Sequence, residues 1–453
     1  MSVSKDGTMN MTEGSAVKLL IIFAIPMMIG NIFQQLYNVA DSIVVGKLIG
    51  ADALAAIGAT GSITFLFFAL CNGIGSGGGI ITAQCFGSGN VSQVKSCIVN
   101  TAYIMIAFPL IVGSIAFFLS GPLLRLLETP EEIMDDALLY TRLMCVGLIF
   151  VSVYNYVSSM LRALGDSKTP LYFLIFSCIL NIFLDILFVK YVGLAVLGAA
   201  IATLISQLIS GALCLIYATA KNPYFKIKKE DMAINKEIII KTVRIGIPLS
   251  LQFSMIAISC MALQRVVNGF GPVAIAAFTS TSRIEQVVHQ PYQTLSAALS
   301  TYSGQNYGAK KYDRLEQGYR KSMLLMTVFT LMILPIMQLF GREITSIFVD
   351  ASETQVIDMG AMALRISSIF YVFLGVIYIV RGVLNGVGDS FFALLNGIVE
   401  VIGRFTVPII LTMIPFIGLW GIWWSVGIVW FISGLAAWLR YRWFKKNIEG
   451  AVM

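Results

Sequence analysis

Long apolar blocks alternate with short polar stretches along the whole chain. Twelve of these blocks reach the ~20 residues that a helix needs to cross a bilayer. They lack the strict apolar–polar alternation of barrel strands, so they predict helices. We place the spans at residues 17–45, 53–83, 94–120, 133–160, 169–190, 194–219, 238–264, 273–303, 320–341, 356–380, 390–414 and 417–440.

Composition supports a membrane protein. Of 453 residues, 57% are hydrophobic and only 12% are charged, whereas an average soluble protein carries about 25% charged residues. The predicted fold class is therefore an all-α polytopic membrane protein with twelve transmembrane helices.

Several short motifs occur twice, about 222 residues apart. Ile25-Pro26 recurs as Ile247-Pro248, and Gly165-Asp166-Ser167 recurs as Gly388-Asp389-Ser390. Long repeats in an apolar chain are typical of two-lobed transporters. Each copy holds six spans, an even number, so both copies enter the membrane in the same direction. We therefore predict two six-helix lobes, 1–220 and 238–453, related by a pseudo-two-fold axis along the membrane normal and joined by a linker at 221–237.

The basic residues predict the orientation in the membrane. With the N-terminus inside, the two tails and the inner loops carry 22 lysines and arginines, whereas the outer loops carry 5. This positive-inside bias places both termini in the cytoplasm of a multi-pass cell-membrane protein. It also accounts for the net charge of +7, so we expect no nucleic-acid partner. The polar stretch from Met1 to Ser15 predicts no cleavable signal peptide.

Proline and glycine mark special places inside the predicted spans. Pro26 and Pro248 occupy equivalent positions, where each kinks its helix, either as a static bend or as a moving hinge. The glycine-rich stretch from Gly73 to Gly79 lies within a span with no preceding strand, so it predicts close helix contact rather than a nucleotide loop. The seven cysteines form no C-x-x-C motif, so we expect neither a disulfide framework nor a metal site beyond Na⁺.

Acidic residues deep in the first copy predict ion chemistry, because ionisable groups are costly within the hydrocarbon. Asp41 lies near the end of the first span, and Asn181 and Asp185 share one face of the fifth span. With Thr203 on the sixth span, they offer hard oxygen ligands for a small cation. Burial and like charge also favour proton uptake by one aspartate. The competing interpretation is that each aspartate caps a helix or pairs with a lysine.

Other polar residues predict substrate contacts in the first copy and the following span. Gln34 and Asn38 lie on the helical face of Asp41. The full set of candidate substrate-binding residues is Gln34, Tyr37, Asn38, Asn155 and Gln252.

The second copy lacks the acidic pair. Asp185 aligns with Pro408 and Asn181 aligns with Arg404. Glu400 and Arg404 have the i, i+4 spacing of an intrahelical ion pair, which is how we interpret them. Glu285 and His289 have the same spacing on the eighth span, where they predict either a structural network or a proton or substrate role.

Taken in order, these motifs resemble the multidrug and toxic compound extrusion (MATE) family. The resemblance covers both halves and includes Gln34-x-x-Tyr37-Asn38-x-x-Asp41, Ala83-Gln84-x-x-Gly87-x-Gly89-Asn90, Arg162-Ala163-Leu164-Gly165-Asp166-Ser167-x-x-Pro170 and Asn181-x-x-x-Asp185. It implies a twelve-helix antiporter that exports organic cations and other amphiphiles in exchange for protons or sodium. The family's N-lobe cation site of two aspartates, an asparagine and a threonine matches Asp41, Asp185, Asn181 and Thr203.

The chain departs from the NorM-like branch of that family, which places acids on spans 7 and 10. Here span 7 offers Gln252, and the interior of span 10 offers Tyr371 and Tyr378. We therefore do not expect a sodium site of that type in the second lobe.

The sequence thus predicts a monomeric multidrug efflux antiporter with no cofactor besides the coupling ion, H⁺ or Na⁺. Its partners would be small-molecule drugs and the lipid bilayer. The alternative is a lipid-linked precursor flippase of the same superfamily, although arginine is sparse within the spans. A channel would need no lobe-scale repeat, and no reactive cluster indicates an enzyme.

Overall fold

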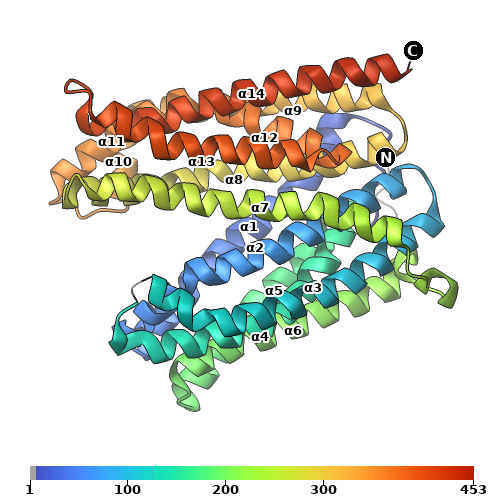
Figure 1. Ribbon diagram of the computed structural model, residues 1–453, viewed down its shortest axis with the longest axis horizontal. Coiled ribbons are helices and arrows are strands. Elements are labelled where there is room, and N and C mark those ends of the chain that lie inside the picture. Colours follow the sequence, from blue (N-terminus) through green and yellow to red (C-terminus); the bar gives the residue numbers. More distant parts are fainter. Residues whose placement is uncertain (1–6, 128, 453) are drawn as a thin grey trace. The chain divides into compact units, whose positions relative to one another are not determined.

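The computed structural model describes residues 7–127 and 129–452, where the regular elements are all helical (Figure 1). The first half contains α1 (Ala16–Leu48), α2 (Ala51–Gly87), α3 (Val91–Leu126), α4 (Glu131–Ala163), α5 (Lys168–Asp185), a π-helical turn (Ile186–Tyr191), α6 (Ala195–Lys221) and two 3-10 turns (Pro223–Phe225 and Lys229–Met232). The second half contains α7 (Lys236–Asn268), α8 (Pro272–Gly308), α9 (Tyr312–Leu339), α10 (Gly341–Ser346), α11 (Thr354–Ile369), α12 (Tyr371–Val387), α13 (Ser390–Thr412), a 3-10 turn (Gly418–Trp420) and α14 (Gly421–Val452).

The helices confirm a polytopic membrane protein. Ten described helices are long and apolar enough to cross a bilayer, and α11 with α12 forms an eleventh span that is bent by 52°. Helix α8 has 37 residues and covers the predicted span 273–303, but its many polar side chains make it too hydrophilic for this criterion. Because α11 and α12 are separate helices, the predicted span 356–380 consists of two helices, and the second of them continues to Val387.

The described residues divide into two compact units. The first unit takes the residues up to Gly14 and those from Ile22 to Phe253, and the second takes Ser15–Ile21 and the residues from Ser254 onward. Helices α1 and α7 therefore each contribute residues to both units. The lobe limits 1–220 and 238–453, the linker 221–237 and the pseudo-two-fold axis stay predictions.

Each unit has its own helix packing. In the first unit, α4 contacts α2, α3 and α6, and α5 contacts α6. Buried side chains such as Ile74, Ile98, Val157 and Met160 form part of its apolar core. In the second unit, α8 packs against α12 and α11, while α14 packs against α13 and α12.

Glycines in α2 allow a close approach to the first half of α7. A Cβ on Gly73 would lie 2.3 Å from the backbone nitrogen of Ser250, and one on Gly77 would lie 2.8 Å from the backbone nitrogen of Gly246. The Ser250 hydroxyl donates across this contact to the Leu70 carbonyl at 2.7 Å. The predicted close helix contact is therefore confirmed.

We expect Gly73→Ala to lower the free energy of unfolding by about 1–3 kcal/mol, because the added methyl overpacks a contact made of backbone atoms. Thermal unfolding of the purified protein in detergent would measure this loss. Gly58→Ala is the matched control, because a Cβ at Gly58 on the same helix meets nothing within 4 Å. Equal melting temperatures for the two variants would contradict the prediction.

The repeated Gly-Asp-Ser turns share a backbone shape but differ in their side-chain partners. Gly165 has a φ of +87°, a left-handed value that suits glycine. The Asp166 carboxylate accepts from the Thr169 backbone N–H at 3.0 Å and from its hydroxyl at 2.6 Å, which holds the start of α5. Burial raises the pKa of Asp166, and its hydrogen bonds with Thr169 oppose that rise. In the second copy, Asp389 instead accepts from Arg440 of α14 at 2.7 Å.

Candidate functional site

Two aspartates lie next to each other inside the first unit. Asp41 sits on α1 and is half-buried, while Asp185 is the last residue of α5 and is fully buried. Their carboxyl groups are close enough to interact directly. The Asn181 amide, oriented so that both of its ends are paired, donates to Asp185 Oδ2 at 2.8 Å.

Helix α6 completes this group through Thr203. The Asn181 amide oxygen accepts from the Thr203 backbone N–H at 3.2 Å, and the Tyr37 hydroxyl lies 3.4 Å from Thr203 Oγ1. The structure therefore brings together Asp41, Asn181, Asp185 and Thr203, with Tyr37 beside them. We call these five residues the first-lobe cluster.

Tyr140 of α4 is a neighbour of the cluster that the sequence did not reveal. Its side chain lies close enough to Asp41 and Asp185 to interact with both carboxyls. No spacing rule relates Tyr140 to either aspartate, because the three residues come from different helices. Its position within an apolar span, just before Thr141, is the only sequence signal that could have singled it out.

The backbone is irregular where the cluster forms. Directly after Asp185, residues Ile186–Tyr191 form a π-helical turn in which the Val192 N–H donates to the Leu187 carbonyl at 3.0 Å. Such wide turns interrupt α-helices frequently at functional sites. Asp185 therefore lies at the point where α5 changes its helical geometry.

The first-lobe cluster has the chemistry of a cation or proton site. One oxygen of each carboxyl, Asp41 Oδ1 and Asp185 Oδ1, is buried without a hydrogen-bond partner in the described structure. A buried acceptor without a partner is costly, so both oxygens favour a proton or a cation. With the Thr203 hydroxyl they form an all-oxygen set, which fits Na⁺ by ligand type. Asp41 lies within α1 rather than at its start, and neither aspartate forms an ion pair with a described lysine.

The candidate substrate residues occupy varied environments in the first unit. Gln34 and Asn155 are half-buried, and Asn38 is exposed. Gln252 on α7 is 6% exposed, and its Oε1 has no described partner. Pro26 is buried within α1, whereas Pro248 is half-buried within α7.

The predicted ion pair between Glu400 and Arg404 is wrong. Glu400 instead accepts from Arg381 of α12 at 2.6 Å, and the same guanidinium donates to Asn396 at 2.7 Å. Both members of the pair are buried, with side-chain exposures of 6% for Arg381 and 11% for Glu400. The predicted tenth span ended at residue 380, so Arg381 was expected in a cytoplasmic loop and not as a buried partner of Glu400.

The other candidate residues of the second unit do not join the pair of Arg381 and Glu400. Arg404 donates to the Ser259 hydroxyl at 3.3 Å. It therefore faces α7 rather than Glu400, which lies one turn earlier on its own helix. Glu285 and His289 are both half-buried on α8. The His289 ring packs edge-on against Trp430, with ring centroids 5.6 Å apart.

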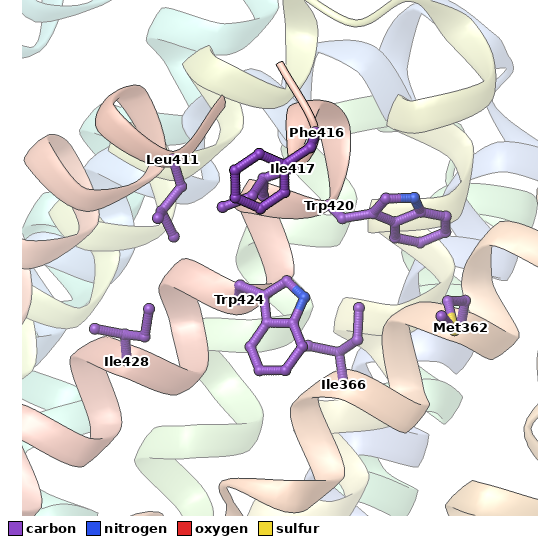
Figure 2. Close-up of a pocket in the computed structure, with 8 residues that line it drawn as sticks. All are labelled: Met362, Ile366, Leu411, Phe416, Ile417, Trp420, Trp424 and Ile428. Carbon is purple, nitrogen blue, oxygen red and sulfur yellow. The ribbon is translucent and has the colours of Figure 1, made fainter. Parts of the chain in front are cut away.

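An apolar pocket of about 440 Å³ lies at one end of the second unit (Figure 2). Side chains from α11, α13, α14 and the segment between α13 and α14 line it, and none of them is titratable: Met362, Ile366, Leu411, Phe416, Ile417, Trp420, Trp424 and Ile428. The pocket therefore offers hydrophobic contact but no group that could bind a coupling ion.

Comparison with known families decides the identity of the chain. The MatE family model matches it twice, at residues 26–187 and at residues 248–409. The chain belongs to the MatE family of multidrug efflux transporters. The second match starts 222 residues after the first, which confirms the internal repeat read from the sequence.

Curated relatives and solved structures of MatE proteins agree with this assignment. The MatE chain is 30% identical to the probable multidrug resistance protein YpnP of Bacillus subtilis, over 95% of its own length and 96% of the relative's. A crystal structure of MATE in the straight conformation superposes with a TM-score of 0.89 at 23% identity, covering 99% of this chain and 100% of that one. A crystal structure of MATE in the bent conformation gives a TM-score of 0.86 at 25% identity, with 97% and 98% covered.

Proposed function

We propose that this MatE chain is a secondary active antiporter that exports organic cations and amphiphilic drugs in exchange for H⁺ or Na⁺. The coupling ion binds at the first-lobe cluster. The protein lies in the cell membrane with both termini in the cytoplasm. The observation that carries this proposal is the pair of neighbouring carboxyls, Asp41 and Asp185, each with a buried oxygen that lacks a partner.

Coupling requires that the ion and the drug stabilise different conformations of the transporter. When the first-lobe cluster is empty, two neighbouring carboxylates repel each other, which favours an open arrangement of α1 and α5. A proton or Na⁺ removes that repulsion and draws Asp41 towards Asp185 and Thr203. In this proposal, α1 then moves towards α5 and α6, and the drug is released.

Pro26 lies on the helix that must move. It sits fifteen residues before Asp41 on α1, and proline removes one helical hydrogen bond from the turn that precedes it. Among the solved MATE structures, one is in a straight conformation and one is in a bent conformation. A moving hinge at Pro26, rather than a static bend, would give α1 the two arrangements that this proposal requires.

Dye efflux from proteoliposomes under separate pH and sodium gradients tests the proposal. The purified protein is reconstituted with ethidium, and each gradient is imposed alone. Export driven by either gradient identifies the coupling ion and supports antiport. Export driven by neither gradient, together with transbilayer movement of a fluorescent polyprenyl lipid, would favour a flippase instead.

A further inference from the structure

An exposed arginine lies at the end of the second unit that contains the apolar pocket. Arg365 is on α11, and its Nε donates to the backbone carbonyl of Gln338 at 3.0 Å. The Gln338 amide donates in return to the Arg365 carbonyl at 2.8 Å. Gln338 is the last residue but one of α9, which is long and apolar enough to cross a bilayer. These two hydrogen bonds therefore hold Arg365 level with the end of a membrane span.

Most of the Arg365 guanidinium is available to a ligand. Apart from the bond made by Nε, its N–H groups donate to no other residue in the described structure, and none of the described carboxylates forms an ion pair with it. A cationic side chain near the end of a membrane helix extends towards the bilayer surface, where lipid phosphates lie. The planar fork of N–H donors on a guanidinium matches the oxygens of a phosphate.

The pocket lies on the same face of α11 as this arginine. Met362 and Ile366 line the pocket, and they are four residues apart on the helix. Arg365 follows Met362 by three residues, and the exposed Ile369 follows Arg365 by four. Residues three or four apart share one face of a helix. Arg365 is therefore a direct neighbour of the pocket.

The rest of the pocket suits a hydrocarbon chain. Trp424 and Ile428 lie one turn apart on α14, and Trp420 comes just before this helix begins (Figure 2). Trp424 is 38% exposed and Phe416 is 87% exposed, so the pocket opens to the surface of the unit. Tryptophan near the end of a span is typical of the boundary between lipid headgroups and hydrocarbon. The pocket therefore begins at the depth where acyl chains begin.

We propose that Arg365 and the pocket together bind an anionic phospholipid such as phosphatidylglycerol. The lipid phosphate accepts hydrogen bonds from the guanidinium N–H groups of Arg365 that have no protein partner. One acyl chain of the same lipid fills the apolar pocket. A zwitterionic lipid binds more weakly, because it brings a second, cationic group towards the arginine. This site lies outside the first-lobe cluster and goes beyond the proposed export function.

Photoreactive lipids test whether an acyl chain enters the pocket. The purified protein is placed in phosphatidylcholine nanodiscs with a trace of phosphatidylglycerol that carries a diazirine on one acyl chain. After irradiation, mass spectrometry identifies the labelled peptides. We expect labelling of the peptides that contain Met362 and Trp424. Ile428→Trp fills the pocket and should abolish this labelling, whereas labelling at Phe118, which is 77% exposed on α3, should stay unchanged.

A second probe with a phosphatidylcholine headgroup tests the contact with Arg365. Because hydrogen bonds between charged groups are the stronger ones, we expect the phosphatidylglycerol probe to label the Met362 peptide at least ~10-fold more than the phosphatidylcholine probe does. Arg365→Gln should abolish this preference, and Arg365→Lys should retain most of it. Arg342→Gln is the matched control, because Arg342 is exposed at the same end of the unit and pairs with Asp358 at 3.4 Å. It should leave the preference unchanged.

Three outcomes would overturn the lipid site. Equal labelling of the wild-type pocket by the two probes would exclude recognition of the anionic headgroup. An equal fall in labelling by both probes in Arg365→Gln would show that the substitution only disturbs the contact with Gln338. Absence of pocket labelling in nanodiscs that contain a dimer would assign the pocket to a second copy of the chain. None of these outcomes depends on transport, so the proposed export function would stand or fall separately.

Discussion

Asp41→Asn is expected to abolish gradient-driven ethidium efflux, reducing it to the rate of protein-free liposomes. The substitution keeps the size of the side chain but removes the charge that a proton or Na⁺ must neutralise. Asp185 would then have a neutral neighbour. The repulsion that opens the empty site would therefore be absent whether or not a proton or Na⁺ is bound. The measurement is the initial efflux rate in proteoliposomes under an imposed pH or sodium gradient.

The control for this loss is Asp52→Asn. Asp52 lies exposed in the first turn of α2, so its replacement makes the same chemical change away from the first-lobe cluster. Both variants should elute as single peaks in size-exclusion chromatography at the wild-type volume. Wild-type efflux by the Asp41 variant would refute coupling at this site.

Arg381→Leu is expected to lower the free energy of unfolding by about 3–5 kcal/mol, because it leaves the Glu400 carboxylate buried without its partner. Asn396 loses the same donor, although its own N–H group still donates to the Ser433 carbonyl at 2.9 Å. Thermal unfolding in detergent, with urea titration where unfolding is reversible, would measure the loss.

Two further variants show whether the pairing itself is the cause. The double variant Arg381→Leu/Glu400→Leu removes both charges and should recover most of the lost stability. Arg342→Leu breaks an exposed pair with Asp358 at 3.4 Å and should cost at most about 1 kcal/mol. A double variant as unstable as Arg381→Leu alone would show that packing around Arg381, rather than its charge, dominates.

Local spacing in the sequence predicted the parts of the site that lie on one helix. Asn181 and Asp185 are four residues apart, so a helix must place them on one face, where the Asn181 amide, oriented so that both of its ends are paired, donates to Asp185. The apolar blocks likewise predicted the helices, because a span in lipid must satisfy its backbone internally. The repeat could be read directly because both copies retain the same turn and proline motifs.

Features that depend on contacts between helices could not be predicted in the same way. Tyr140 reaches the aspartates from a third helix, and the pairing of Arg381 with Glu400 joins two helices across a turn. The spacing of Glu400 and Arg404 allowed an ion pair, but tertiary contacts gave each residue a different partner. The bend before Tyr371 has no proline or adjacent glycine to mark it, so periodicity alone predicted one continuous span.

The contact between α2 and α7 has a consequence for how the chain is made. Gly73 and Gly77 belong to α2, the second helix to be synthesised. The surface that packs against them consists of residues 242–250 of α7, the seventh helix. The first six helices therefore leave the ribosome before the α7 surface that packs on this pair of glycines, the glycine seam of α2, has been made. We expect a chain released after residue 220 to expose this seam and to be degraded, whereas release after residue 253 would let the first unit complete its packing.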